Sequence, residues 1–493
     1  FTNPNNYLPR ATDGLTQARN EQDQLQKQFR FDARYTLPIA APTSVKAGFH
    51  WRSLQMDQWG KDRHRWSYKA ATAYDPSQRI APDASYVSYD MIRTGRKIPF
   101  WQAEGLTKDG RPADPSLWVE DMYFNESQKY IGTNGVTESI GAYYAMIQGR
   151  LASRGWLART GYLAGIRLED VKTRSFGWVR ARVATTAAQQ LADPIGSATK
   201  DYANTDRLLY GKFDQKFPSI HAYHDITKDL KFRTSYSTSY GRAPLANLLP
   251  GETIDETNQR LTINNPALKP QQAKNWDLTL EYYFEPVGSL TVGWFHKDIR
   301  DFIVSNQDAR IIPAGPNNGY DGEYAGFTER TSFNGGTVTV NGWEFAYQQQ
   351  FTFLPGLLKG LSTSLNYSWT DQHGLREGTR YLTRREIAGF IPHAANASLN
   401  WRYGKTSLRA LYNFTGENIT TFNPTYPALN QYRYSMKTLN LGASYQYQPN
   451  LGFTIDASNV LNEPQRWYIG SKDRMRRTTI NFVTVTIGVN GRF

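Results

Sequence analysis

Strict alternation of apolar and polar side chains is the feature of this sequence that most limits its fold. In 275–284, the apolar side chains alternate with Asn, Asp, Thr and Glu. The same pattern recurs in 361–370, 395–403, 408–414 and 439–447. Successive side chains of a β-strand point to opposite faces, so these segments predict strands with one apolar and one polar face.

Short turns and long polar loops alternate between the strands. Short turns fall at 153–155, 285–288, 403–405 and 448–450. Long loops fall at roughly 57–136, 172–207, 242–271, 306–324, 373–391, 417–431 and 463–477. This segregation is typical of transmembrane outer-membrane barrels, whose turns are periplasmic and whose loops are extracellular. We therefore predict an all-β, antiparallel, up-and-down transmembrane barrel.

About 15 strands are expected, within the range that such barrels use. Their predicted ranges are 27–37, 43–56, 137–152, 156–171, 208–226, 229–241, 272–284, 288–305, 325–351, 361–372, 392–403, 405–416, 432–447, 450–462 and 478–493. Counted back from a periplasmic C-terminus, the first of these strands runs toward the periplasm. A complete even-numbered barrel begins in the other direction, so we expect an odd number of strands upstream.

Composition agrees with a barrel once the alternation is taken into account. The mean hydropathy is only −0.61, and no stretch approaches the ~18 apolar residues of a membrane helix. Aromatic residues nevertheless make up 14% of the chain. The absence of cysteine argues against disulfide scaffolds and thiol catalysis. The net charge of +13 is scattered, which favours lipopolysaccharide phosphates or anionic solutes over nucleic acid.

Tyrosines and tryptophans near strand ends form the expected membrane girdle, because amphipathic rings prefer the headgroup level. These residues are Tyr282, Tyr283, Trp369, Trp401, Tyr403, Tyr445 and Tyr447. The alternative is that they form the core of a soluble sandwich, which would leave the regular loop segregation unexplained. The chain begins at Phe1 without a charged and then apolar leader, so we expect an N-terminally incomplete chain.

Several ordered motifs resemble those of TonB-dependent outer-membrane receptors. The segments 216–223, 229–244, 264–284 (with Asn-Pro-Ala-Leu-Lys-Pro) and 288–303 resemble the middle of that family's barrel. The segments 165–169, 341–344 and 456–464 resemble strands on either side. Phe493 resembles the terminal aromatic residue that the barrel-assembly machinery recognises, although Gly491 departs from the usual bulky residue. The resemblance covers 137–493 well and 27–56 weakly.

The resemblance implies a barrel of about 22 strands closed around an N-terminal plug. Residues 1–493 would then be the C-terminal part of the barrel, with the signal, the TonB box, the plug and the first strands upstream. The implied partners are outer-membrane lipid and lipopolysaccharide, the TonB–ExbB–ExbD complex and the assembly machinery. A monomer, no cofactor and no covalent chemistry are also implied.

Ligand contact, if it follows the family, comes from the long loops. The candidates are Trp59, Trp66, Arg96, Trp101, Trp118, Tyr123, Arg242, Tyr320, Tyr324 and Arg376. Aromatic rings can stack on sugars or aromatic chelators, and cations can meet carboxylates or phosphates. The alternative for each residue is a loop side chain that only packs on its neighbours.

No catalytic or metal-binding constellation is predicted. Glu120 and Asp121 form a carboxylate pair that reads better as a solvated loop than as an acid–base pair. His221 and His224 lie three apart on a strand and should face opposite sides, which argues against shared metal ligation.

The favoured function is TonB-dependent import of a scarce large solute, with a ferric siderophore as the favoured cargo. Uptake of an oligosaccharide or of cobalamin is an alternative cargo assignment. A passive porin and a secreted β-rich carbohydrate-binding protein or hydrolase are the alternatives from other classes.

Overall fold

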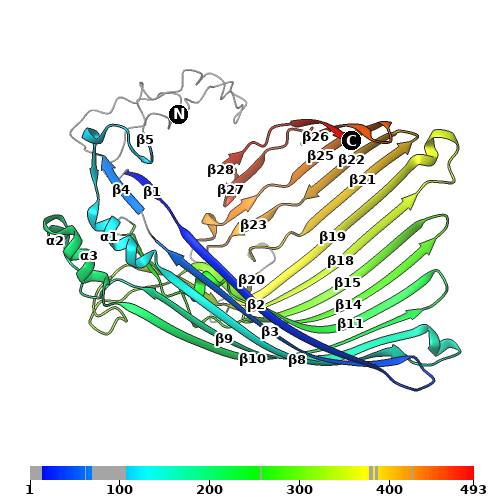
Figure 1. The fold of residues 1–493 in the computed structure, drawn as a ribbon, viewed down its shortest axis with the longest axis horizontal. Helices are drawn as coiled ribbons and strands as arrows, with labels where there is room; N and C mark the ends of the chain where they lie inside the picture. Colours follow the sequence, from blue (N-terminus) through cyan, green and yellow to red (C-terminus); the bar gives the residue numbers. More distant parts are fainter. Residues whose placement is uncertain are drawn as a thin grey trace.

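One large antiparallel sheet dominates the protein (Figure 1). The computed structural model describes residues 14–60, 63–68, 107–255, 258–376, 381–382, 387–423 and 426–492. The sheet has 16 strands, and because β20 (Tyr381–Leu382) lies off the main path, fifteen form the continuous wall. Among the described residues, no helix is long and apolar enough to cross a membrane.

The fifteen strands of the wall follow one another in sequence order, each antiparallel to its neighbours. They are β2 (Glu21–Thr36), β3 (Thr43–Trp59), β8 (Asn134–Arg150), β9 (Thr160–Trp178), β10 (Asp206–Asp225), β11 (Leu230–Gly241), β14 (Gln271–Phe284), β15 (Gly288–Arg300), β18 (Gly336–Gln350), β19 (Leu361–Arg376), β21 (His393–Tyr403), β22 (Thr406–Thr415), β25 (Met436–Gln448), β26 (Leu451–Ser458) and β29 (Thr484–Gly491).

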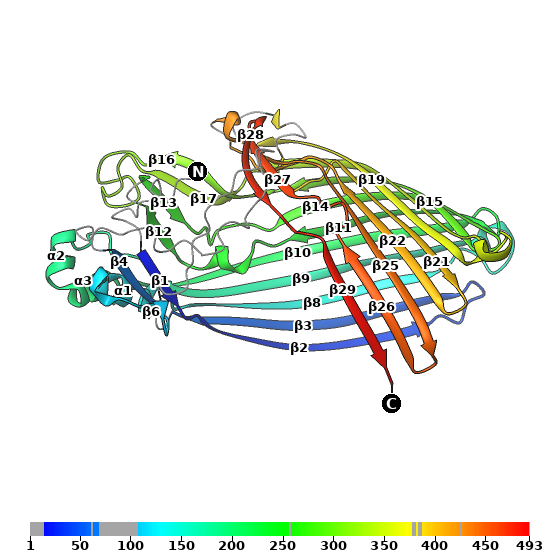
Figure 2. The ribbon, with the colours of Figure 1, turned by 90° about the horizontal axis from the view of Figure 1, so that it is seen from above.

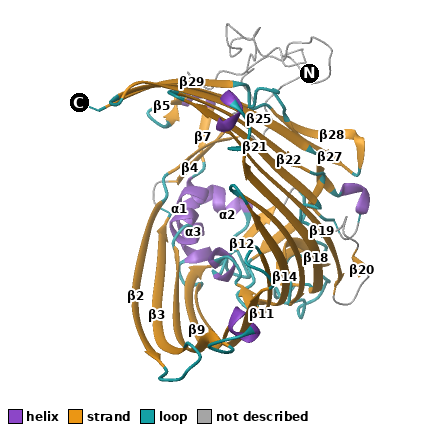
Figure 3. Ribbon diagram, turned by 90° about the vertical axis from the view of Figure 1, so that its right-hand side faces the viewer, coloured by secondary structure: helices purple, strands orange, loops and turns teal. Residues whose placement is uncertain are grey.

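The wall curves into an open trough with β2 and β29 as its two edges (Figures 2 and 3). In the described part of the chain, no pairing joins these two strands. The prediction of about 15 antiparallel strands is confirmed. Closure into a barrel of about 22 strands stays a prediction.

Short turns lie at one end of the wall and long loops at the other, as predicted (Figure 1). The loops carry their own small sheets and helices. Three small sheets contain β1 (Gly14–Ala18), β4 (Arg63–Tyr68) and β7 (Trp118–Glu120); β12 (Glu252–Asp255), β13 (Arg260–Ile263), β17 (Thr328–Asn334) and β16 (Ile303–Ile311); and β23 (Asn418–Thr421), β24 (Gln431–Arg433), β27 (Gln465–Ile469) and β28 (Ser471–Thr479). The other loop elements are β5 (Thr107–Lys108), β6 (Arg111–Pro112), α1 (Met122–Ile131), α2 (Ala187–Ala192) and α3 (Pro194–Tyr202).

Four predicted strands run past the wall into the loop sheets. The predicted strands 288–305 and 432–447 extend into β16 and β24. The predicted strand 325–351 is two strands in different sheets, β17 and β18. Gly336, with φ of +109°, begins β18 where the chain leaves the loop sheet. The predicted start of the last strand at 478 is wrong, because 471–479 form β28 and the wall strand β29 begins at Thr484.

The outward face of the wall is apolar, and aromatic rings lie in register across it. Trp294, Trp343 and Trp369 are direct cross-strand neighbours on β15, β18 and β19. Of the predicted girdle residues, those on the outward face are Tyr282, Trp369, Trp401, Tyr403, Tyr445 and Tyr447. This placement supports the girdle, because single rows of aromatic residues mark the edges of a lipid-facing band.

Tyr283 is the exception among the predicted girdle residues. It follows Tyr282 on β14, and neighbouring side chains of a strand point to opposite faces. Its hydroxyl donates to Glu281 Oε2 at 2.7 Å on the inward face. The assignment of Tyr283 to a lipid-facing girdle is therefore wrong.

The long loops fold back over the inward face near their own end of the wall. Val338 and Val340 of β18 pack with Ile387, Ile419 and Phe422 from two later loops. On β9, Ser175 donates to the carbonyl of Leu248 at 2.8 Å, so the segment after β11 crosses this part of the wall. The loops thereby line and narrow the long-loop mouth.

Candidate functional site

Two short strands in the loop between β3 and β8 bring four functional side chains to one face. In the register of β4 with β7, Trp66 pairs with Glu120. His64 lies two residues before Trp66, and Trp118 two residues before Glu120, so all four share a face. The His64 and Trp66 rings stack with centroids 5.6 Å apart.

A pocket of about 490 Å³ opens on this face. Trp66 and Trp118, both predicted from the sequence as ligand residues, line it. Trp66 is 7% exposed, so most of its ring is buried behind the pocket surface. The remaining lining residues are His64, Arg111, Pro112, Pro115, Glu120, Met122, Asn125, Glu126 and Lys129. A pocket with aromatic walls and a few polar groups of both charges is the usual form of a small-molecule site.

Glu120 and Asp121 have different partners despite their adjacency. Glu120 Oε1 lies 2.8 Å from His64 Nδ1 and accepts from Asn125 Nδ2 at 2.8 Å, which fixes it in the pocket wall. Asp121 caps α1 by accepting from the backbone N–H of Phe124 at 2.8 Å. It also accepts from Arg65 Nε at 3.0 Å. This arrangement is structural and supports the reading of the pair as loop residues.

Four long loops are joined behind this pocket. Asp201 of α3 is fully buried and accepts from the Tyr123 hydroxyl of α1 at 2.7 Å. The same carboxylate accepts from the backbone N–H and the hydroxyl of Thr185 at 2.8 and 2.7 Å. A buried carboxylate needs such donors, because an unpaired charge is costly away from water. Asp201 therefore connects the β3–β8 loop to the β9–β10 loop.

Two arginines extend the connection to the next two loops. Arg182 makes a bidentate pair with Glu252 at 2.9 and 2.6 Å. Arg180 donates to the Tyr324 hydroxyl at 2.7 Å and lies 3.6 Å from Glu323. We call the set Tyr123, Arg180, Arg182, Thr185, Asp201, Glu252 and Tyr324 the loop knot. It joins four of the long loops at the mouth to one another.

Burial keeps the tyrosines at and beside this knot protonated. It raises the pKa of Tyr123, and the bond to Asp201 raises it further. Burial and then the charge of Glu329 raise the pKa of Tyr320 to about 12. Burial likewise raises the pKa of Tyr324, against the opposing charge of Arg180. At neutral pH these hydroxyls are therefore hydrogen-bond donors.

Four of the remaining predicted ligand residues are buried or bonded to other residues of the chain. Tyr320 and Tyr324 are 5% and 8% exposed, and Tyr123 is bonded to Asp201. Arg242 makes an ion pair with Glu138, whose side chain is 4% exposed, and so anchors the crossing segment to β8. The contacts of these four residues support roles in packing the loops. Ligand contact at these residues stays a prediction, and it would require the loops to separate.

Trp59 ends β3 on its outward face, away from the pocket. Arg96, Trp101 and Phe493 lie outside the described residues, as does the side chain of Arg376 at the end of β19.

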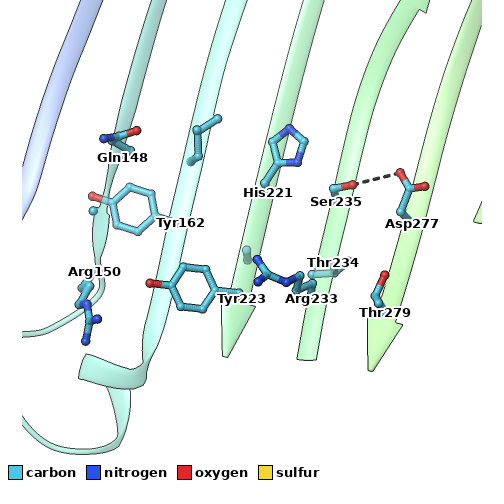
Figure 4. Close-up of a pocket in the computed structure, with 13 residues that line it drawn as sticks. Gln148, Arg150, Tyr162, His221, Tyr223, Arg233, Thr234, Ser235, Asp277 and Thr279 are labelled. Carbon is cyan, nitrogen blue, oxygen red and sulfur yellow. Dashed lines mark hydrogen bonds between the residues drawn. The ribbon is translucent and has the colours of Figure 1, made fainter. Parts of the chain in front are cut away.

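A second pocket, of about 540 Å³, lies on the inward face near the short-turn end (Figure 4). His221, Tyr223, Arg233, Ser235 and Asp277 line it from β10, β11 and β14, and Ser235 donates to Asp277 at 3.0 Å. The sequence reading missed this set. The polar face of three consecutive strands at one level was the signal that could have found it.

His224 lies on the opposite face of β10 from His221, as predicted. Its Nδ1 lies 2.8 Å from the Thr160 hydroxyl oxygen, at hydrogen-bond distance. Among the described residues, no group of three or more His, Cys, Asp or Glu could hold a metal ion.

Comparison with known proteins explains the loop-rimmed, two-faced wall. The sequence model of the TonB dependent receptor-like β-barrel family matches residues 1–462. This chain belongs to that family. Its members are outer-membrane proteins of Gram-negative bacteria, so the apolar face of this TonB-dependent barrel chain meets lipid. Its short turns are periplasmic and its long loops extracellular.

Solved structures of such receptors share the fold. The ferric-catecholate import receptor Fiu from K12 E. coli aligns with a TM-score of 0.58 at 13% identity, covering 97% of this chain and 55% of that one. The ferric yersiniabactin uptake receptor FyuA from Yersinia pestis gives 0.55 at 13% identity, with the same coverage of 97% and 55%. The copper transporter OprC gives 0.55 at 11% identity, covering 96% and 58%.

The chain thus spans little more than half the length of these receptors. At such identities the likeness shows the fold alone. A search of curated protein sequences gave no match.

Proposed function

We propose that this chain forms part of the barrel of a TonB-dependent importer that carries a ferric siderophore into the periplasm. The observation that carries the cargo assignment is the pocket of Trp66, Trp118 and Arg111 in the extracellular loops. Residues 1–493 would be the C-terminal part of the barrel. The plug, the TonB box and about seven strands would lie upstream, as in a barrel of about 22 strands.

The chemistry of the pocket fits a compact anionic chelate. Flat aromatic walls can stack on the rings of a chelator, and the exposed Arg111 has no ion-pair partner in the described part of the chain. Lys129 lies at the same pocket but is paired with Glu126 at 2.5 Å. Arg111 is therefore the group best able to meet a carboxylate or catecholate oxygen.

The rigid rim supports a binding role as well. Preorganised loops lose less conformational entropy when a ligand binds, which leaves more of the contact energy for affinity. Two of the structures with similar folds are named as receptors for ferric catecholates and ferric yersiniabactin, which supports an iron chelate. The copper transporter aligns equally well, so the fold does not distinguish these cargoes.

Transport would need the parts of the protein that lie upstream. In this proposal, the chelate binds at the extracellular mouth, and the inner-membrane TonB complex pulls on the plug to open a path. The barrel itself carries out no covalent step. An oligosaccharide importer is the competing assignment, because Trp118 could also stack on a sugar ring.

The test is uptake of iron-55 through the complete protein in a strain without other siderophore receptors. We expect Trp118→Ala and Arg111→Gln each to weaken chelate binding roughly tenfold, as the loss of an aromatic or arginine anchor does. The matched controls are Trp156→Ala and Arg154→Gln, the same residue types in a periplasmic turn. Labelled maltodextrins are the competing probe.

Iron uptake that depends on TonB and fails in the two loop variants supports the proposal. Uptake of maltodextrin but of no ferric siderophore would replace it with the oligosaccharide assignment. Passage of small solutes without TonB would make the protein a passive pore.

A further inference from the structure

The outward face of β2, β3, β8, β9 and β10 carries side chains in straight rows, because each residue has a direct partner on the next strand. One row consists of Lys216, Leu168, Tyr143, Phe49 and Phe31. The next row toward the periplasm is Pro218, Ile166, Ala145, Ala47 and Ala33. Successive rows are about 7 Å apart along the strand, since they are two residues apart. Below Lys216, this face is the lipid-facing band.

Charged side chains appear on this face at the level of the aromatic rings and increase above them. The row of Trp51 and Phe29 already carries Asp170 and Asp214 at its other end. The row above it consists of Lys212, Lys172, Ser139, Ser53 and Lys27. Arg174 lies in the row above that. These residues are on the outside of the wall, so they cannot meet a solute that passes through the lumen.

We infer that Lys27, Lys172, Arg174, Lys212 and Lys216 bind the phosphate groups of lipopolysaccharide, the anionic lipid of the outer leaflet. We call these five residues the outer cationic patch. They lie at the extracellular edge of the lipid-facing band, which is the level of the outer-leaflet headgroups. The five cations face only two carboxylates in these rows, Asp170 and Asp214.

Most of the positive charge of the patch is uncommitted. Lys172 and Lys212 share Asp170, at 3.8 and 3.2 Å, and their side chains are 67% and 61% exposed. Exposed pairs of this kind contribute little and exchange readily for a better partner. Lys27, Arg174 and Lys216 have no ion-pair partner among the residues that the structure describes.

The patch also has room for a headgroup. Between Lys172 and Lys27 the same row holds only Ser139 and Ser53, which hydrogen-bond to each other at 3.3 Å. Below them lies Gly141, where a Cβ would meet nothing within 4 Å. The two cationic ends are thus separated by three strand spacings, roughly 14 Å, over a low floor. Sugar rings can lie on this floor while phosphates meet the cations at either side.

Among the described residues, no comparable cluster lies above the tryptophan row of β15, β18 and β19. The second row above the Trp294, Trp343 and Trp369 row consists of Lys274, Asp298, Thr339 and His373. One lysine there faces one aspartate in the next strand. A general need for charge at the membrane edge would give both sectors a similar number of cations.

The test is binding of purified lipopolysaccharide to the complete protein. The protein is refolded in detergent, so that it carries no lipopolysaccharide from the cell. The variant combines Lys172→Gln, Arg174→Gln and Lys212→Gln. The control combines Arg154→Gln, Lys228→Gln and Lys359→Gln, three exposed cations in the periplasmic turns. Each basic residue near an anionic membrane surface strengthens binding about fivefold, so we expect a loss of roughly 100-fold in the variant and none in the control.

Two further binding measurements serve as controls. One distinguishes lipopolysaccharide from free phosphate, and the other distinguishes the loss of charge from a change in packing. Inorganic phosphate should bind weakly and equally to all variants. Phosphatidylglycerol, which carries a single phosphate, should lose far less affinity in the triple variant than lipopolysaccharide does. The charge-retaining variant Lys172→Arg with Lys212→Arg should bind lipopolysaccharide as the parent does, with the same heat-dependent shift in gel migration.

Affinity of the triple variant within threefold of the parent would overturn the assignment. So would an equal loss of inorganic phosphate binding, or a loss in the charge-retaining variant.

Discussion

The buried carboxylate of Asp201 should hold the extracellular rim together, and its removal is the sharpest test of the loop knot. Asp201→Ala leaves the Tyr123 hydroxyl and the buried Thr185 backbone N–H without the fully buried carboxylate that accepts from both. The hydroxyl can turn toward another acceptor, but the backbone N–H cannot. Local opening of the rim should therefore become much easier while the wall strands stay paired.

The size of the effect follows from the contacts. Hydrogen bonds to a charged group contribute about 1.5–3 kcal/mol each, and an unsatisfied buried donor costs about 1–3 kcal/mol. With three such bonds to Asp201, partly compensated by water entering the cavity, we expect a loss of about 3 kcal/mol. Asp201→Asn keeps a side-chain oxygen that accepts from the Thr185 backbone N–H. Its amide N–H groups can donate to the hydroxyls of Tyr123 and Thr185, so the loss of stability should be only about 1 kcal/mol.

Hydrogen exchange in the detergent-solubilised protein measures the opening directly. A loss of about 3 kcal/mol should speed exchange of the amides in 181–202 by roughly 100-fold in the Ala variant. Asp201→Asn should speed it less than tenfold. Exchange in β14 and β15 serves as the internal control. Unchanged exchange in the Ala variant, or equal effects of Ala and Asn, would refute the reasoning.

Three more predictions concern other parts of the chain. Arg242→Ala should cost about 3 kcal/mol of local stability, because it leaves the buried Glu138 with only Arg52 at 3.5 Å, and faster exchange in 242–250 would measure it. Gly360→Ala should lower the temperature at which the barrel loses its heat-dependent gel shift, since a Cβ there would clash with the Arg402 carbonyl oxygen; an unchanged temperature would contradict this. The pKa of Tyr320, raised from 10.0 to about 12, means that the folded rim holds this proton more tightly than the unfolded chain. Its stabilisation is complete below pH 10 and should be lost as the pH rises toward 12, so subtilisin should cut the loops faster across that range in the parent than in Tyr320→Phe.

The wall was predictable because lipid and lumen impose one simple rule on every strand. Alternation located β14, β21 and β22 almost to the residue, and the turn lengths set the two ends. The rule failed at β16, β17, β24 and β28. These strands belong to hairpins within the loops, and the prediction assigned parts of them to the wall. It also failed at Tyr283, where adjacency to Tyr282 suggested one face for both.

The loop roles were not predictable in the same way. Whether a tyrosine in a long loop meets ligand or packs depends on partners far away in sequence, as with Tyr123 and Asp201, which are 78 residues apart. The sequence did select Trp66 and Trp118, which the fold brings to one pocket. It passed over Arg111, because nothing local marks an arginine that has no ion-pair partner among the described residues.

The loop knot also bears on how the outside of the cell is recognised. Since Asp201, Arg180 and Arg182 connect four extracellular loops, the surface they present is a conformational epitope. Antibodies raised against peptides from single loops should bind the denatured chain better than living cells. For the same reason, a graft that moves one loop to another barrel would lose its shape, whereas a graft of all four could keep it.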